Sequence, residues 1–240
     1  MNTRLEFVDI IRGVAIIGVV LFHFVWDLEF TGFIAGIASH SVWLWFGRTL
    51  AGTFMLLVGV SLVLAHREQV HWTAFWCRFA IVIAAAATIT VLTYFAFPQS
   101  YIFFGILHSI AVASLAGILF VKSRPWVCLS IGVFTLLLPE FIGTSILDPR
   151  WLAWIGLFAN QPVSNDFVPF FPWAGLTFLG MGLAQSLNLN DFRGNGTPII
   201  SGNHLLRWIS WSGRKSLPIY LIHQPVLLAI IVPVSWLFGE

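Results

Sequence analysis

The first apolar segment of the chain carries four ionisable side chains: Asp9, Arg12, His23 and Asp27. On an α-helix, the spacing between Arg12 and His23 brings both residues to one face, within about 20° of each other. Asp9 is one turn from Arg12 and Asp27 is one turn from His23, so all four share a single stripe. Ionisable groups inside a membrane segment are costly and mark a functional site by default. The stripe has two ends, because Arg12 and His23 stand about 16 Å apart along the helix axis.

The outer end of this stripe suits proton-transfer chemistry. A carboxylate one turn away, Asp27, can fix the tautomer of the His23 imidazole and raise its basicity, as a general base requires. Arg48 and His108 are expected at a similar depth in two other apolar segments, and we group both with His23 and Asp27. A lone histidine such as His108 is also typical of a simple interhelical hydrogen bond, and that interpretation stays open.

The inner end of the stripe suits the binding of an anion. Besides Asp9 and Arg12, we expect the following residues there, all at the start of the last apolar segment: Arg214, Lys215, His223 and Gln224. Pro218 fits the first turn of that helix, whose free amides and dipole would bind a phosphate-rich ligand together with the two cations. Two simpler interpretations stay open: an Asp9–Arg12 ion pair that only locks helix packing, and cations that only set the orientation in the membrane.

The composition indicates that these residues belong to a membrane protein. Hydrophobic residues make up 58% of the 240 residues and charged residues make up 9%, against roughly 45–50% and 25% in soluble domains. So few charges cannot cover a soluble fold, which excludes a soluble globule and a nucleic-acid-binding protein. A bilayer-spanning helix needs about 20 apolar residues. We expect an all-α polytopic bundle with seven spans, at about 8–30, 42–65, 77–97, 101–121, 126–143, 167–187 and 217–238.

The distribution of lysine and arginine predicts the orientation of this bundle. Under the seven-span model, only Arg48 and Arg150 of the 12 Lys and Arg residues fall toward one side. The others fall on the opposite side: Arg4, Arg12, Arg67, Arg78, Lys122, Arg124, Arg193, Arg207, Arg214 and Lys215. Cytoplasmic loops carry the excess of positive residues, so the amino terminus is predicted in the cytoplasm and the carboxyl terminus outside. We expect residues 1–240 to form one transmembrane domain.

Three further patterns set expectations about loops and packing. Cys77 and Cys128 lack metal-ligand spacing, so we interpret both as small apolar residues and expect no metal site. The longest polar loop is predicted at 188–216, and the glycosylation sequon at Asn195 is expected to be a chance match on the cytoplasmic side. Small residues at 84–87, 180 and 182 permit close helix contacts. These contacts fit a homodimer as well as internal packing, and we favour internal packing.

Two motifs at the ends of the chain resemble a known family of membrane enzymes. The run from Val8 to His23, VDIIRGVAIIGVVLFH, resembles the first helix of the transmembrane acyltransferase superfamily, which is marked by an arginine and a histidine at this spacing. The segments HFVWD, from His23, and GRKSLPIYLIHQP, from Gly213, are similar to the heparan-α-glucosaminide N-acetyltransferase catalytic-domain family. The resemblance spans the whole chain.

This resemblance implies an enzyme that moves an acyl group, usually acetyl, from cytoplasmic acyl-CoA to an acceptor outside the membrane. The acceptor is expected to be a hydroxyl or an amine of a sugar or glycan. The family's histidine corresponds to His23 and its arginine to Arg12. Whether His23 acts as a base or as a transient acyl carrier stays open. The expected location is a prokaryotic cytoplasmic membrane.

A mechanism follows if the resemblance holds. Acetyl-CoA, as the acyl donor, would bind its phosphates near Arg214, Lys215 and the inner end of the stripe. Its thioester would lie near His23, where the acceptor is deprotonated. Arg48 or His108 would stabilise the oxyanion that forms on the thioester carbonyl.

Two other classes of protein also place Asp, Arg and His in membrane spans. A small transporter or proton-coupled carrier would have a water path open to both faces and no acyl transfer. A structural membrane subunit would use the charges only for packing, would copurify with a partner chain and would tolerate replacement of His23.

Overall fold

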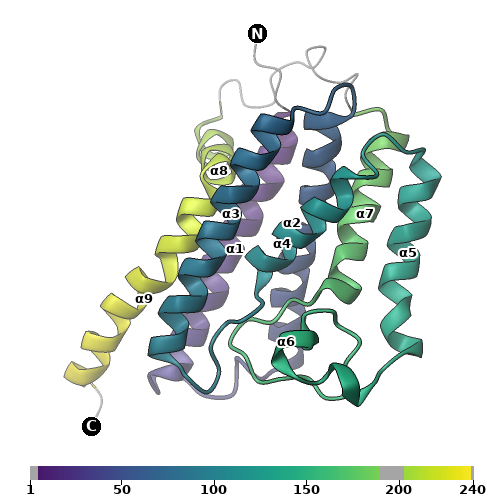
Figure 1. Cartoon of the computed structure of the whole chain (residues 1–240). Coiled ribbons are helices and arrows are strands. Elements are labelled where there is room, and N and C mark those ends of the chain that lie inside the picture. Colours follow the sequence, from purple (N-terminus) through teal and green to yellow (C-terminus); the bar gives the residue numbers. More distant parts are fainter. Residues whose placement is uncertain (1–4, 190–202, 239–240) are drawn as a thin grey trace. The chain divides into compact units, whose positions relative to one another are not determined.

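The computed structural model describes residues 5–189 and 203–238, and these residues form helices joined by loops, with no β-sheet (Figure 1). Two compact units arise, unit 1 from residues 1–54 and 192–240 and unit 2 from residues 55–191. The longer helices are α1 (Glu6–Phe30), α2 (Ser41–His66), α3 (Trp72–Ala96), α4 (Ile106–Ile118), α5 (Pro125–Phe141), α7 (Phe170–Ser186), α8 (His204–Arg214) and α9 (Ser216–Phe238). A short helix, α6 (Arg150–Ala153), lies in a loop of unit 2.

The predicted all-α architecture is confirmed for the described residues. A long helix lies at each of the seven predicted segments, and four of them, α1, α2, α3 and α9, are long and apolar enough to cross a membrane. Helices α4, α5 and α7 have 13, 17 and 17 residues, fewer than the roughly 20 residues that span a bilayer. The number of seven spans, the orientation and the single-domain assignment therefore stay predictions.

In unit 1, α1 packs against α8 through two glycines. A β-carbon on Gly13 would overlap the carbonyl group of Ile209, and a β-carbon on Gly213 would overlap the carbonyl oxygen of Asp9. Any larger residue would push the two backbones apart, so glycine is needed at both positions. This contact fixes the level at which the last part of the chain meets α1.

The long helices of unit 1 share an apolar core beyond this contact. Ile16 and Val19 of α1 are buried together with Leu50 from the first half of α2. Ile219 and Tyr220 of α9 pack against the same cluster. Helices α1 and α9 are thus in contact on the far side of the two glycines, where the ionisable stripe of α1 continues.

The prediction of a polar loop at 188–216 is wrong for residues 204–214, which form helix α8. Asn203 caps this helix, since its side-chain oxygen accepts hydrogen bonds from the backbone amides of Leu205 and Leu206. Arg4, Arg193 and the sequon at Asn195 lie outside the described residues.

In unit 2, α7 packs tightly against its neighbours. A β-carbon on Gly180 would overlap the backbone of Leu56, and one on Gly182 would press on Leu129. The Thr177 hydroxyl donates a hydrogen bond to the carbonyl oxygen of Met55, at 2.9 Å. The preference for internal packing is therefore confirmed for these two glycines.

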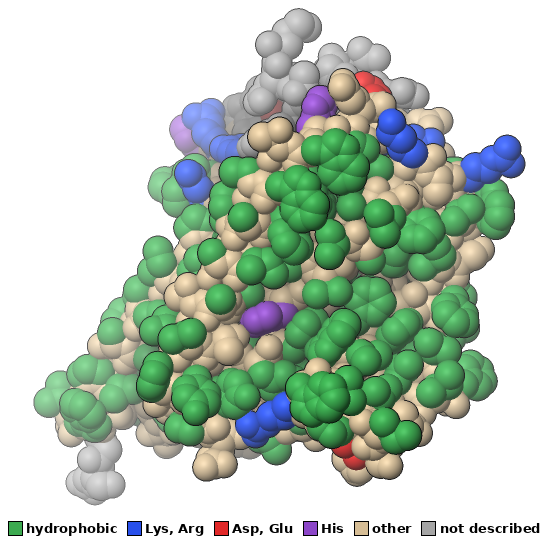
Figure 2. Space-filling view, in the orientation of Figure 1, with side chains coloured by type: hydrophobic (Ala, Val, Ile, Leu, Met, Phe, Trp, Pro, Cys, Tyr) green, Lys and Arg blue, Asp and Glu red, His purple; other side chains and the backbone are tan. Residues whose placement is uncertain are grey.

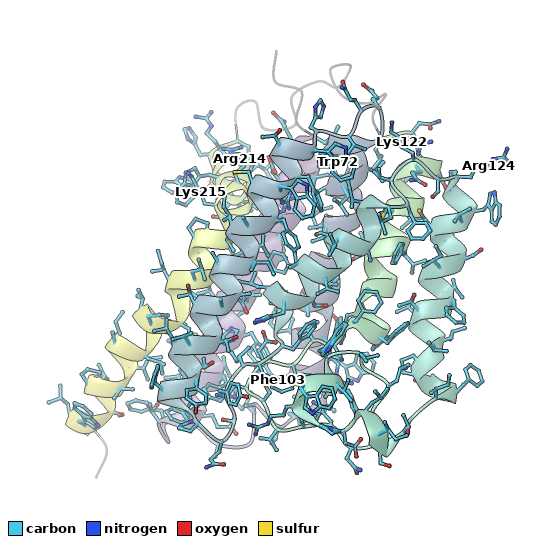
Figure 3. The ribbon with its side chains drawn as sticks, viewed as in Figure 1. Trp72, Phe103, Lys122, Arg124, Arg214 and Lys215 are labelled. Carbon is cyan, nitrogen blue, oxygen red and sulfur yellow. The ribbon has the colours of Figure 1, made fainter. Side chains whose placement is uncertain are left out.

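The two ends of unit 2 differ in charge. Lys122 and Arg124 lie at the same end as Trp72, whereas Phe103 lies toward the other end (Figure 3). Hydrophobic side chains cover most of the face seen in Figure 2, as expected for a surface against lipid. Within this unit the loop that carries Lys122 and Arg124 thus lies at the end where α3 begins (Figure 3).

Two loops are held by carboxylates. Glu29 accepts hydrogen bonds from the backbone amides of Ile37 and Ala38, at 2.8 and 2.7 Å. Asp148 accepts from the side chain of Asn160 and from the backbone amides of Ala159 and Asn160. The Asn160 side chain and these amides lower the pKa of Asp148 below its ordinary value.

We expect Gly13→Ala to destabilise unit 1, because the new β-carbon overlaps the backbone of α8. Overpacking of this kind typically costs about 1–3 kcal/mol. Thermal unfolding in detergent measures the loss. Gly143→Ala is the matched control, since a β-carbon there makes only an ordinary contact, 3.4 Å from the carbonyl oxygen of Phe158. Equal melting temperatures for the two variants would contradict the close contact between α1 and α8.

Candidate functional site

Two histidines face each other between α1 and α9 in unit 1. The ring centroids of His23 and His223 lie 4.7 Å apart, with the rings at 74°. Nδ1 of His23 is 2.9 Å from the carbonyl oxygen of Val19, and Nδ1 of His223 is 2.7 Å from that of Tyr220. Because a carbonyl oxygen only accepts, each Nδ1 carries the hydrogen in the neutral ring. Each Nε2 is then left with a lone pair, which can take a proton.

A carboxylate and an amide lie beside the histidines. Nε2 of Gln224 donates a hydrogen bond to Oδ1 of Asp27, at 2.7 Å. Asp27 has no exposed surface and His223 is 8% exposed. Oδ2 of Asp27, Oε1 of Gln224 and Nε2 of His223 are buried without a hydrogen-bond partner. These residues and His23 lie within about one helical turn of the paired rings, and we call their hydrogen-bond acceptor atoms, with Nε2 of His23, the acceptor niche.

The prediction that Asp27 orients His23 is wrong. The Val19 carbonyl holds the His23 ring, and Asp27 bonds Gln224 instead. A histidine on a helix can reach the carbonyl oxygen four residues earlier, so the backbone supplies the acceptor that was assigned to the carboxylate. The position of Asp27 next to the catalytic candidate was correct, but its partner lies on the last helix.

The predicted grouping of His223 and Gln224 with Asp9 and Arg12 is also wrong, because both residues lie in the acceptor niche with His23 and Asp27. The cause is the level at which α8 meets α1, where Gly213 contacts Gly13. His23 lies ten residues beyond Gly13 on α1, about 15 Å along the helix axis, whereas His223 follows Gly213 after the break between α8 and α9 at Lys215. The sequence alone gave the depth of His223 only relative to the start of its own apolar segment.

The inner end of the stripe contains the predicted ion pair. Nη1 of Arg12 lies 3.1 Å from Oδ1 of Asp9, and the Asp9 side chain is buried. Gly213 contacts the backbone of Asp9, so the exposed cations that follow it, Arg214 and Lys215, belong to the same end of unit 1 (Figure 3). Nη1 of Arg214 donates to the Ser210 hydroxyl, at 2.8 Å. The binding of a phosphate there stays a prediction.

The other two predicted site residues have different surroundings. Arg48 is exposed, with its guanidinium 5.5 Å from the centre of the Trp45 ring. His108 belongs to unit 2, where its Nδ1 accepts from the Gly105 amide and its Nε2 lies 3.2 Å from the Thr90 hydroxyl oxygen. The Thr90 hydroxyl itself donates to Ile102, so Nε2 of His108 donates to Thr90. Both ring nitrogens are engaged, and the interhelical hydrogen-bond interpretation of His108 is confirmed.

Sequence reasoning missed an aromatic group next to His23. Phe22 stacks on Trp43 with ring centroids 5.6 Å apart and touches the His23 ring edge-on. The indole nitrogen of Trp43 is buried without a hydrogen-bond partner. No spacing rule could have identified it, because Trp43 is one of 12 tryptophans in an aromatic-rich chain.

Residues 4–225 match the family model described as "Heparan-alpha-glucosaminide N-acetyltransferase, catalytic". The chain belongs to this family. The match confirms the resemblance stated above and includes every residue of the acceptor niche. No curated protein and no solved structure matches the chain. Membership of the family and the four long apolar helices indicate an acetyltransferase-type enzyme of the membrane.

We expect Gln224→Leu to destabilise this N-acetyltransferase family member, because the substitution removes the only hydrogen bond to the buried Asp27 carboxylate that the described residues provide. Loss of a partner to a buried polar group costs about 1–3 kcal/mol, and more for a charged one. Unfolding in detergent measures the difference from wild type. Gln161→Leu, at an exposed position, is the control and should unfold like wild type. Equal losses for both variants would disprove the role of Gln224.

Proposed function

We propose that the protein is a membrane-embedded acyltransferase that moves an acetyl group from cytoplasmic acetyl-CoA to an amine of an extracytoplasmic sugar or glycan. Membership of the acetyltransferase family supports the reaction class. The pairing of His23 with His223, each seven residues from the nearer end of its helix, supports the placement of the chemistry at the acceptor niche. A prokaryotic cytoplasmic membrane is the proposed location.

The character of the acceptor niche is the observation that carries this proposal. Asp27, His223 and Gln224 each leave a buried acceptor atom without a donor, and His23 adds a further lone pair through Nε2. Buried polar groups are nearly always hydrogen-bonded, so such a niche is complementary to a ligand rich in hydrogen-bond donors. An amine in its ammonium form supplies three N–H donors, whereas a hydroxyl supplies one. The niche therefore favours an amine over a hydroxyl as the acceptor.

The two histidines then have separate roles. Nε2 of His223 takes one proton from the bound ammonium, which leaves a neutral amine with a free lone pair. The amine nitrogen attacks the thioester carbonyl carbon, and a C–N bond forms. Nε2 of His23 takes a second proton from nitrogen as the C–S bond breaks, and then protonates the departing thiolate. The Val19 carbonyl keeps the His23 ring in the tautomer that this step needs.

The donor would lie along the stripe of α1. About 15 Å separates the niche from the level of Gly13 and Gly213. Coenzyme A carries its phosphates at one end and its thioester at the other, so an extended donor suits this separation. Arg12, Arg214 and Lys215 are the cations for its phosphates. Arg48 is left as the candidate for oxyanion stabilisation, because both ring nitrogens of His108 are engaged.

We expect His23→Ala to lower acetyl transfer by at least about 100-fold, the lower range for loss of a general base. The assay uses the whole protein in proteoliposomes with acetyl-CoA on one side and glucosamine on the other. His71→Ala, an exposed histidine in the loop between α2 and α3, is the control and should retain activity. Unfolding temperatures of both variants exclude misfolding as the cause. Transfer at the wild-type rate by His23→Ala would remove His23 from the chemistry.

The amine preference has its own test. With glucosamine and glucose offered at equal concentration, we expect N-acetylated glucosamine as the product and little O-acetylated sugar, by mass spectrometry. Asp27→Asn replaces an acceptor in the niche by a donor, so it should lower transfer to glucosamine. Comparable acetylation of glucose by the wild-type protein would contradict the amine assignment and leave the acyltransferase assignment standing.

A further inference from the structure

Helix α8 presents an exposed apolar face that the other described helices of unit 1 leave open. Leu205, Trp208 and Trp211 are 67%, 67% and 45% exposed. They recur every three residues, so they form one stripe on the helix. Trp208 and Trp211 touch each other edge-on, with centroids 5.9 Å apart. This arrangement places a continuous apolar and aromatic strip on the side of α8 that faces away from α1.

The opposite side of α8 is already occupied by packing. Ser210 and Gly213 are buried, and the Ile209 carbonyl contacts Gly13 of α1. The helix is therefore anchored in unit 1 by its inner side. The exposed strip is not needed for this packing.

The charges around the strip have one sign. Arg207, Arg214 and Lys215 are exposed on or next to α8. No acidic residue occurs between Asn203 and Ser216. Lysine and arginine beside tryptophan and leucine on one helix face are typical of helices that lie in the membrane interface, where basic residues are attracted to anionic headgroups.

The level of α8 relative to a bilayer follows from the next helix. Helix α9 begins at Ser216, two residues after α8 ends, and Ser216–Leu237 is one of the candidate membrane spans. A helix that directly precedes a span lies at the boundary between lipid and water. Its exposed tryptophans are then placed where tryptophan is enriched in membrane proteins.

We propose that the outer face of α8, formed by Leu205, Arg207, Trp208 and Trp211, is a binding surface for acidic phospholipids of the surrounding bilayer. The tryptophans and Leu205 enter the headgroup layer, and Arg207 pairs with phosphate. This surface does not depend on acyl transfer. It uses none of the residues assigned to the donor or to the acceptor niche.

Quenching of tryptophan fluorescence by brominated lipids tests the proposal. The whole protein is placed in nanodiscs of equimolar phosphatidylcholine and phosphatidylglycerol, in which only one of the two lipids has brominated chains. The emission lost in the double variant Trp208→Phe, Trp211→Phe isolates the signal of α8. We expect brominated phosphatidylglycerol to quench this signal about twofold more than brominated phosphatidylcholine, because acidic headgroups gather at basic surfaces.

Two substitutions separate the contribution of α8 from general surface charge. Arg207→Gln should reduce the preference for phosphatidylglycerol, whereas Arg124→Gln, an exposed cation in the loop between α4 and α5, should leave it unchanged. Absence of quenching by either lipid would show that the face is not in the bilayer and would overturn the proposal. Equal quenching by both lipids, unaffected by Arg207→Gln, would overturn its selectivity for acidic lipid. Acetyl transfer by the nanodisc sample reports separately on the proposed enzyme activity.

Discussion

The arrangement of unit 1 depends on the backbone contact between Gly13 and Gly213. Two helices can approach this closely only where neither carries a β-carbon, so the contact has one register. That register sets the depth along α1 at which α9, the helix after α8, begins. Beyond the break at Lys215, Ile219 and Tyr220 of α9 pack against the cluster of Ile16 and Val19, and the rings of His23 and His223 meet further along α1 and α9. A shift of one helical turn between α1 and the last helices would separate the histidines by about 5 Å and would break the bond between Asp27 and Gln224.

The glycine contact between α1 and α8 also has to compensate for the free energy that the unpaired buried atoms of the acceptor niche cost. Each buried acceptor without a donor costs about 1–3 kcal/mol, and Asp27, His223 and Gln224 each contribute one such atom. A sequence selected only for stability would have paired or removed these atoms. Their retention on two helices that are otherwise packed by Ile16, Val19 and Ile219 is understandable if a ligand supplies the missing donors. The apolar packing and the glycine contact hold the two helices together.

Much of this fold could be read from the sequence, and the errors concern how helices pair and where a short helix forms. Apolar runs located the long helices, and helical periodicity placed Asp9, Arg12, His23 and Asp27 on one stripe, with the Asp9–Arg12 ion pair as expected. Spacing along one helix is fixed by its geometry. The position of one helix relative to another is fixed by side-chain packing, which periodicity does not contain. His223 and Gln224 were assigned to the wrong end for this reason, and α8 was missed because its 11 residues are far fewer than a membrane span needs.

The same reasoning explains why the backbone, and not Asp27, orients His23. On a helix in lipid, a carbonyl four residues earlier is always within reach of a histidine, and it stays an acceptor at any pH. A carboxylate in that role would have to remain charged in a medium of low dielectric constant, which is costly. The carbonyl oxygens of Val19 and Tyr220 accept hydrogen bonds from the Nδ1 atoms. Both rings therefore keep the hydrogen on Nδ1 and the lone pair on Nε2 without help from a buried charge. The bond from Gln224 to Asp27 ties α1 to α9 at the depth where the chemistry is proposed.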